Sequence, residues 1–340
     1  MGKRMTEYVD ELLANGALEK TEFEEFLKFR NVETTGYLYE KARRLRSQIL
    51  GDHVTVIGRI PLSNHCKNEC KMCGIRRDDR LVKRFRLSEK EVLSFCGEFQ
   101  SQGVEMILLE SGDDTYLTEE NVAELLLKIK RKFSRLTIFL SLGERNENVF
   151  RHWKAVGAEG YFFSHGSADD SFFKKIYPSN MSPLLKKQHL WNLKNLEYKV
   201  AAGFLVGMPY QTVDHVISDI MFVKKYMPAY VNIGVFQPVP RSVFEKQRSG
   251  NGEMALYILA MLRLMLPNCH IIAEPTLDCA LKDGRMKAFD AGADTLLIDV
   301  ADLSLLNQYR VYERKNGRLA LPADSLPSFM GQLSLRGFSI

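Results

Sequence analysis

The sequence predicts an α/β fold of the (β/α)8 TIM-barrel type, with a helical N-terminal extension and a short C-terminal cap. Two observations carry this prediction. Eight short apolar runs alternate with amphipathic stretches from residue 53 onward, and a helical pattern precedes them over residues 1–50. Strands that alternate with helices pair in parallel, and eight such strands close a barrel.

The chain divides into three predicted parts. Residues 1–50 form the helical extension, with one helix opening at Thr21 and a second over 34–50. Residues 51–300 form the barrel, and residues 301–340 form a cap over its mouth. The 340 residues, 45% of them hydrophobic, are enough for a large core.

The predicted strands follow from the apolar runs. They cover residues 53–60, 106–110, 137–141, 161–164, 199–206, 230–236, 270–273 and 295–298. Helices are predicted between them, over residues 88–102, 118–133, 212–226, 252–266 and 283–291. One more helix follows the third strand and ends at residue 156, and helical turns follow the fourth strand as far as residue 196. Ser88 and Glu91 form a capping box at the first of these helices, and Thr118 caps the second.

Charge and hydropathy exclude several classes of protein. The formal net charge is +5, from 47 Lys plus Arg against 42 Asp plus Glu, which does not indicate a nucleic-acid partner. No apolar run approaches the ~20 residues of a membrane span, and the N-terminus lacks the apolar core of a signal peptide. We therefore expect a cytoplasmic protein with neither nucleic-acid nor membrane partners.

Three of the six cysteines, Cys66, Cys70 and Cys73, fall within eight residues. A secreted disulfide framework is denser and occurs in shorter chains, so this cluster indicates metal ligands in a reducing compartment. The loop follows the first strand, and in a barrel that loop opens at the C-terminal face, where active sites lie.

The number of cysteines favours an iron–sulfur cluster. Three thiolates hold three irons of a cubane and leave the fourth iron open for a small chelating molecule. A structural zinc site needs four protein ligands, and His65 is the residue that would complete a Cys₃His site, so zinc stays an alternative. Buried structural cysteines are disfavoured because Lys67, Glu69 and Lys71 mark an exposed loop.

Several motifs extend this pattern along the chain. They are Cys73-Gly-Ile-Arg-Arg-Asp-Asp with Arg-Phe-Arg-Leu-Ser88, Glu110-Ser-Gly-Asp113, Ser141-Leu-Gly-Glu-Arg145, Gly203-Phe-Leu-Val-Gly-Met-Pro-Tyr-Gln-Thr212, Leu262-Arg-Leu-Met-Leu-Pro267 and Asp290-Ala-Gly-Ala-Asp294. Together with Cys-x₃-Cys-x₂-Cys they resemble the radical S-adenosylmethionine (SAM) superfamily. The resemblance covers essentially the whole chain and is to the group of the hydrogenase maturase HydE, the methylornithine synthase PylB and biotin synthase.

This resemblance implies a 4Fe–4S cluster and SAM as cofactors. It implies reductive cleavage of SAM to a 5′-deoxyadenosyl radical, which abstracts hydrogen from a small-molecule substrate. It also implies an electron donor such as flavodoxin or ferredoxin as a partner. The cofactor carries the difficult chemistry, while the protein positions it and excludes water.

The resemblance also assigns candidate cofactor-binding residues. They are Met72, Gly74, Ser111, Gly112, Asp113, Ser141, Glu144, Gly207, Met208 and Tyr309. Each has an ordinary structural explanation too, such as a strand-to-helix turn at Gly112, a surface pair of Glu144 with Arg145, or a tail tyrosine packed on the barrel mouth.

The end of strand four departs from the relatives. Where HydE has Arg-His-Glu, this chain has Ser164-His165-Gly166, so both charged groups are missing. The arginine expected on the next helix falls at Leu185, beside Lys186 and Lys187, and we assign Lys187 to the cofactor. His165 is a candidate substrate-binding residue, with a buried core histidine as the alternative.

The substrate pocket departs as well. Glu274 stands where HydE has a threonine, Asp278 matches an aspartate that PylB uses for an amino group, and Asn232 replaces a PylB arginine. Glu274 and Asp278 predict an acidic floor suited to an ammonium or other cation, unless they lie in a surface loop. Tyr312 is a further candidate in this region.

The leading hypothesis is a HydE-like enzyme acting on a small amino-acid-type or metal-bound substrate, in hydrogenase or other metallocofactor maturation. The runner-up is a PylB-like mutase or lyase, which Asp278 favours. A zinc or iron–sulfur binding scaffold is the non-enzyme alternative.

Overall fold

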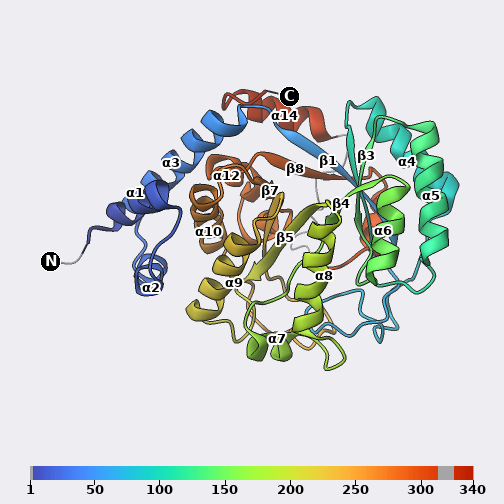
Figure 1. Cartoon of the computed structure of the whole chain (residues 1–340), viewed down its shortest axis with the longest axis horizontal. Helices are drawn as coiled ribbons and strands as arrows, with labels where there is room; N and C mark the ends of the chain where they lie inside the picture. The colour runs from blue at the N-terminus through green and yellow to red at the C-terminus, as the bar shows by residue number, and fades with distance from the viewer. Residues whose placement is uncertain (1–2, 313–324, 340) are drawn as a thin grey trace.

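The computed structural model describes residues 3–312 and 325–339. Eight parallel strands form a closed barrel in the order β1 to β8, with each strand beside its neighbour in sequence. Helices surround the barrel, and the N-terminal helices lie at one side of it (Figure 1). This confirms the predicted TIM-type barrel and its helical N-terminal extension.

The strands are short, and most coincide with the predicted runs. Their bounds are β1 (Thr55–Ser63), β2 (Met106–Ser111), β3 (Thr137–Ser141), β4 (Ala158–Phe162), β5 (Lys199–Val206), β6 (Tyr230–Val235), β7 (His270–Ala273) and β8 (Thr295–Asp299). The fourth strand lies earlier than its predicted range of 161–164. Its run Ala158–Phe162 pairs with both β3 and β5, and the next residues leave the sheet.

Helices fill the connections on the outside of the barrel. The N-terminal helices are α1 (Met5–Asn15), α2 (Lys20–Lys28) and α3 (Val32–Leu50). The barrel helices are α4 (Glu89–Ser101), α5 (Glu119–Lys132), α6 (Glu147–Ala155), α7 (Asp170–Ile176), α8 (Pro183–Asn195), α9 (Val213–Tyr226), α10 (Gly252–Met265), α11 (Thr276–Ala280) and α12 (Gly284–Asp290). Two more follow the barrel, α13 (Leu303–Gln308) and α14 (Leu326–Ser334).

Side-chain caps start most of these helices. Ser88 and Glu91 form the predicted capping box of α4, and Thr118 caps α5. The predicted start of α2 at Thr21 is wrong, because Glu19 and Glu22 form the capping box and the helix begins at Lys20. Glutamate is an unusual N-cap residue, whereas threonine is a common one. The sequence pattern therefore favoured Thr21, two residues after the actual cap, Glu19.

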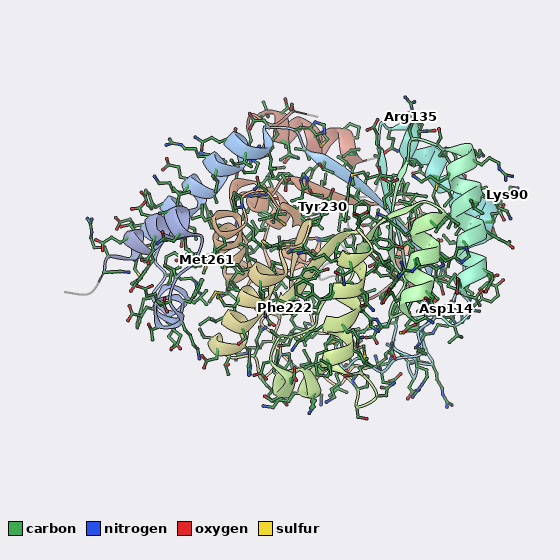
Figure 2. The ribbon with its side chains drawn as sticks, in the orientation of Figure 1. Lys90, Asp114, Arg135, Phe222, Tyr230 and Met261 are labelled. Atoms are coloured by element: carbon green, nitrogen blue, oxygen red, sulfur yellow. The ribbon has the colours of Figure 1, made fainter. Side chains whose placement is uncertain are left out.

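The main core lies between the barrel and its helices. Figure 2 shows the side chains of Phe222 and Met261 within this layer, while Lys90 and Arg135 point outward. The extension α1–α3 packs on α10, for example through the rings of Phe26 and Tyr257, whose centroids are 5.0 Å apart. Within the described ranges, no helix combines the length and apolarity needed to cross a bilayer.

A smaller cluster fills the interior of the barrel. Its buried members are Ile57, Leu108, Phe139, Ala201, Tyr230, Ile272 and Leu297, one from nearly every strand. This plug closes the barrel below the carboxyl ends of the strands. Polar residues that follow it on the same strands are therefore left facing an open upper half.

Candidate active site

The loop after β1 carries the three clustered cysteines, and the end of β2 fixes its position. The main-chain N–H of Asp113 points at Cys66 Sγ across 3.4 Å, and the Lys67 N–H donates to Asp113 O at 3.0 Å. Gly112 makes this approach possible. A Cβ atom there would collide with His65 O and lie 2.7 Å from Cys66 Cβ.

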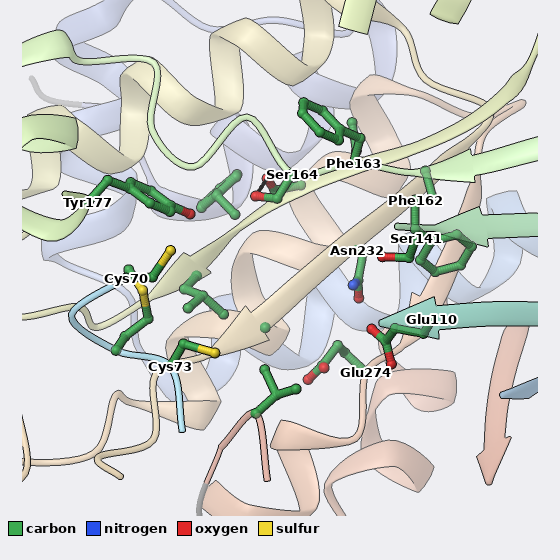
Figure 3. Close-up of a pocket in the computed structure, with 18 residues that line it drawn as sticks. Cys70, Cys73, Glu110, Ser141, Phe162, Phe163, Ser164, Tyr177, Asn232 and Glu274 are labelled. Atoms are coloured by element: carbon green, nitrogen blue, oxygen red, sulfur yellow. Dashed lines mark hydrogen bonds between the residues drawn. The ribbon is translucent and has the colours of Figure 1, made fainter. Parts of the chain in front are cut away.

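The cysteine loop forms one wall of a cavity of about 330 Å³ at the carboxyl ends of the strands (Figure 3). Cys70 and Cys73 lie at one end, and Glu110, Glu274 and Asn232 lie at the other. Aromatic and aliphatic side chains from β4, β5 and the adjoining loops line the space between, among them Phe162, Phe163, Tyr177, Phe204, Leu205 and Val311. The cavity therefore combines a thiol-bearing wall with an apolar middle and an acidic end.

The thiols of this loop are strongly affected by burial. Desolvation raises the pKa of Cys73 to about 12 and raises the pKa values of Cys66 and Cys70 above their ordinary range. The charges of Cys73 and Cys66 act to raise the pKa of Cys70 further. A bound cation reverses this balance, because a thiol that coordinates a metal is deprotonated.

The three thiols are not arranged around a single ion. Within residues 3–312 and 325–339, no three His, Cys, Asp or Glu side chains gather as they would to hold one metal ion. A closed tetrahedral zinc site of Cys₃His type needs such convergence. A cubane cluster binds each thiolate through a different iron, so it does not require the three sulfurs to converge on one point.

The acidic end of the cavity rests on a buried charge network. Glu110 Oε2 lies 3.6 Å from Arg59 Nη1, and Arg59 Nε donates to Asp299 Oδ1 at 2.7 Å. Glu274 is about nine-tenths buried; its Oε2 accepts from the Thr276 N–H at 2.6 Å and from the Thr276 hydroxyl. Desolvation raises the pKa of Glu274. No Lys, Arg or His is found among the described residues that line the cavity.

Comparisons with known proteins relate the whole chain to known enzymes. No protein-family model matches the chain. The [FeFe] hydrogenase maturase subunit HydE of Thermotoga maritima is 28% identical over 94% of this chain and 93% of its own length. A 3-methylornithine synthase of Methanosarcina acetivorans is 25% identical over 90% of this chain and 86% of its own. The chain belongs to the radical SAM superfamily.

Solved structures of the superfamily confirm the fold. The crystal structure of methylornithine synthase (PylB) superposes with a TM-score of 0.86, at 23% identity over 97% of this chain and 96% of that one. The FeFe-hydrogenase maturase HydG from Carboxydothermus hydrogenoformans gives 0.77 at 19% identity, over 98% of this chain and 78% of that one. The barrel described above is thus a radical SAM barrel, and the chain is an enzyme of this superfamily.

The donors present fit the cofactors that the superfamily implies. Soft thiolates are the ligands of iron–sulfur clusters, and this radical SAM enzyme presents three of them beside a cavity closed by apolar side chains. The contact between Gly112 and the His65–Cys66 main chain holds the loop against the strand ends.

Some of the residues assigned from the sequence lie at this cavity. Met72, Ser141, Asn232 and Glu274 line it. Ser111, Gly112 and Asp113 lie beside the cysteine loop, where Asp113 binds Arg145 at 2.8 Å and lies 3.3 Å from Lys67 Nζ.

Of the two adjacent lysines on α8, Lys186 is the one whose charge acts on Cys70, while Lys187, the residue assigned from the sequence, is bound by Asp170 and Ala168. Lys187 Nζ bonds Asp170 and the Ala168 carbonyl, at 2.8 and 2.9 Å. Lys186 is buried, with its ammonium 3.6 Å from Glu144 Oε1 and 4.4 Å from the centroid of the Phe163 ring. Its positive charge also acts to lower the pKa of Cys70, against the larger effect of burial.

Two predicted substrate residues lie away from the cavity. Asp278 is bound by Arg285, whose Nε is 2.5 Å from its Oδ2, so it adds nothing to the acidic end. His165 is fully buried, with Nε2 3.1 Å from Asp219 Oδ1 and its ring against Phe222. In this structure His165 is therefore a buried core histidine, which was the alternative to a substrate-binding role.

The other assigned residues have structural contacts. The Gly74 N–H donates to Val311 O, and the Gly207 N–H donates to Gln211 Oε1 at 2.7 Å. Met208 packs in a small apolar cluster. Tyr309 is buried, and Tyr312 lies close enough to Arg59 to act to raise its pKa. The direct cofactor or substrate contacts assigned to them stay predictions.

Three functional features were missed or underused. Glu110 belongs to the motif Glu110-Ser-Gly-Asp113, but the sequence does not indicate that it lies with Glu274 at the acidic end of the cavity. Arg59 is a charged residue within an apolar strand, which was a usable signal for a buried network. Lys186 was recognised only as a neighbour of the expected position, because the one-residue choice between adjacent lysines depends on the phase of α8.

Proposed function

We propose that this enzyme binds a 4Fe–4S cluster through Cys66, Cys70 and Cys73, and uses it with SAM to abstract hydrogen from a small cationic substrate. The observation that carries the proposal is the single cavity that has Cys70 and Cys73 at one end and two carboxylates at the other. The first end suits the cofactors and the second suits the substrate. A HydE-like role in metallocofactor maturation is the setting that the sequence favours.

The chain's own residues hold, orient and shield the reactants. The three thiolates would hold three irons, and Lys186 and the Ser111–Asp113 turn would bind the carboxylate and amino groups of SAM. Bound together, the cluster and SAM supply a hydrogen-abstracting radical. Phe162, Phe163 and Tyr177 enclose the cavity and keep water from the reacting groups.

The acidic end defines the substrate class. Glu110 and Glu274 face the same cavity, with the amide of Asn232 beside them. At this end of the cavity, Arg59 is 3.6 Å from Glu110 and is already bound by Asp299, so an ammonium or other cationic group is the partner that the two glutamates favour. Asp278, which had favoured an amino-acid rearrangement of the PylB type, is instead held by Arg285. That reaction therefore remains the second candidate.

Metal analysis tests the cluster. The wild type, Cys70→Ala and the control Cys96→Ala are purified and reconstituted anaerobically with iron and sulfide. Cys96 is a buried core cysteine on α4, distant in sequence from the loop. We expect about four irons per chain in the wild type and the control, and loss of most of the iron in Cys70→Ala. A colourless protein that retains zinc would contradict the proposal.

Isotope transfer tests the substrate class. Deuterated amines, diamino acids and their uncharged isosteres are incubated with the reconstituted enzyme, SAM and dithionite, and deuterium in 5′-deoxyadenosine is measured by mass spectrometry. We expect transfer only from compounds that carry an ammonium group, and a loss of at least about tenfold in Glu274→Gln. Equal transfer from the uncharged isosteres would exclude a cationic substrate while leaving the cluster proposal intact.

A further inference from the structure

A second cleft, of about 490 Å³, lies at the opposite end of the barrel from the cavity described above. It is formed by the end of α3, the link from Gly51 to the start of β1, and the turn after α14. These segments are tied by hydrogen bonds from Ser339 N–H to Asp52 O and from Val54 N–H to Ser339 O, both within 3 Å. In Figure 1 the end of α3 and α14 lie side by side at the top of the molecule.

The cleft gathers four arginines from the two ends of the chain. Its charged lining consists of Arg43, Arg44, Arg46 and Arg336 against Glu40 and Asp52. Four positive charges against two negative charges give this small space an excess of positive charge, whereas the chain as a whole is nearly balanced, with +5 over 340 residues. The excess is therefore a local property of this cleft.

Arg46 is the fixed element of the cleft. Only 2% of its surface is exposed, and its guanidinium lies 4.1 Å from the centroid of the Phe338 ring. Its Nη1 donates to Gly51 O at 2.7 Å and to Asp52 Oδ1 at 3.0 Å. Its Nε is buried and has no hydrogen-bond acceptor among the described residues. The side chain is thus held rigidly, with donor capacity left over.

Arg43 lies three residues before Arg46, on the same face of α3. It forms neither an ion pair nor a side-chain hydrogen bond with any residue of the described ranges. Burial has the largest effect on the pKa of Arg46 and lowers it, and the charge of Arg43 acts in the same direction. The two guanidinium groups therefore repel each other. Arg336 lies 3.5 Å from Asp290, and Arg44 lies 3.5 Å from Glu40, so these two are only loosely paired.

We propose that this cleft is a binding site for a small soluble anion that carries a phosphate group. A phosphate group would accept hydrogen bonds from Arg43 and Arg46 together and remove their mutual repulsion. Arg336 would bind from the opposite wall, and the volume admits a phosphomonoester or a pyrophosphate with part of the molecule attached to it. The site is independent of the proposed radical chemistry, because it is at the other end of the barrel.

Titration calorimetry tests the proposal on the full-length protein in a phosphate-free buffer of low ionic strength. Inorganic phosphate and pyrophosphate are the probes, and the variants are Arg43→Gln and Arg336→Gln. Both side chains are exposed, so the substitutions leave the core intact. The control is Arg131→Gln, an exposed arginine in the last turn of α5, outside the cleft.

We expect saturable binding of one anion per chain, tighter for pyrophosphate than for phosphate, with an increase in melting temperature. Each cleft variant is expected to weaken binding at least about tenfold, and Arg131→Gln less than twofold. Two results would overturn the proposal. One is that neither probe shows saturable binding. The other is that Arg43→Gln, Arg336→Gln and the control Arg131→Gln all bind the probes as tightly as the wild type does.

Discussion

Arg59 of β1 and Asp299 of β8 are register partners in adjacent strands, and their side chains form a buried ion pair with 2.7 Å between Nε and Oδ1. Asp299 is 1% exposed and Arg59 is 7% exposed. Because Glu110 is 3.6 Å from the same guanidinium, one arginine compensates two carboxylates, and one of these lines the cavity. The network closes the barrel between its first and last strands and holds Glu110 at the acidic end.

Replacing Arg59 is expected to destabilise the fold strongly. Arg59→Met leaves Asp299 buried without its cation, and breaking a buried pair in this way costs about 3–5 kcal/mol. Urea unfolding monitored by circular dichroism measures the change. The control is Arg151→Met, which breaks an exposed pair with Glu147 and is expected to cost less than about 1 kcal/mol. Similar losses in the two variants would show that the Arg59 network does not stabilise the barrel.

Lys186 is expected to contribute to SAM affinity, while Lys187 is not. In Lys186→Met the buried ammonium beside the cysteine loop is lost, and the dissociation constant for SAM should rise at least about tenfold, as for the loss of one hydrogen bond to a charged group. Lys187→Met removes only the contacts with Asp170 and Ala168. Calorimetric titration of the reconstituted protein with SAM measures both. A large effect in Lys187→Met alone would reverse the assignment.

Gly112 is expected to tolerate no side chain. Gly112→Ala places a Cβ atom against His65 O and Cys66 Cβ, so the cysteine loop must move away from β2. We expect a loss of most of the iron after reconstitution. Gly36→Ala, in the second turn of α3, has no atom within 4 Å of the new Cβ and should raise stability by about 0.5–1 kcal/mol. If Gly112→Ala retained full iron content, the loop would not depend on this contact.

Glu274 is expected to make stability fall as pH rises. Burial raises its pKa above the ordinary value of 4.5, so the folded state keeps a proton that the unfolded state has lost. The destabilisation therefore grows as pH rises from about 4.5 through the raised folded pKa, and it is absent at lower pH. Glu274→Gln keeps an acceptor for Thr276 and does not titrate. The variant should be the more stable protein at neutral pH, with the difference vanishing in acid. A difference independent of pH would contradict this.

The barrel was predictable because its strands are continuous apolar runs, and a parallel barrel buries them on both sides. Thr137–Ser141, Lys199–Val206 and His270–Ala273 were predicted at their observed bounds. The cysteine loop was also evident, since its spacing is local. Strand four was displaced because Phe163 is as apolar as the strand itself, and apolarity alone does not show where pairing ends.

The rest of the site depends on contacts between distant segments. Glu110 and Glu274 are 164 positions apart in the chain and meet only when the barrel closes. Asp278 has the right chemistry for an acidic pocket, but Arg285 at the start of α12 binds it. His165 is at the predicted strand end, yet the chain turns it outward against Asp219 and Phe222. The sequence pattern does not contain these long-range pairings.

The central claim is that Cys66, Cys70 and Cys73 support radical SAM chemistry in this cavity. The most direct test is to measure 5′-deoxyadenosine by liquid chromatography after adding dithionite and SAM to the anaerobically reconstituted protein. We predict that the wild type and Cys96→Ala release 5′-deoxyadenosine, and that Cys70→Ala, assayed at equal folded protein, releases none above the protein-free background. Equal release from Cys70→Ala, or none from a wild type that carries its full complement of iron, would contradict the account.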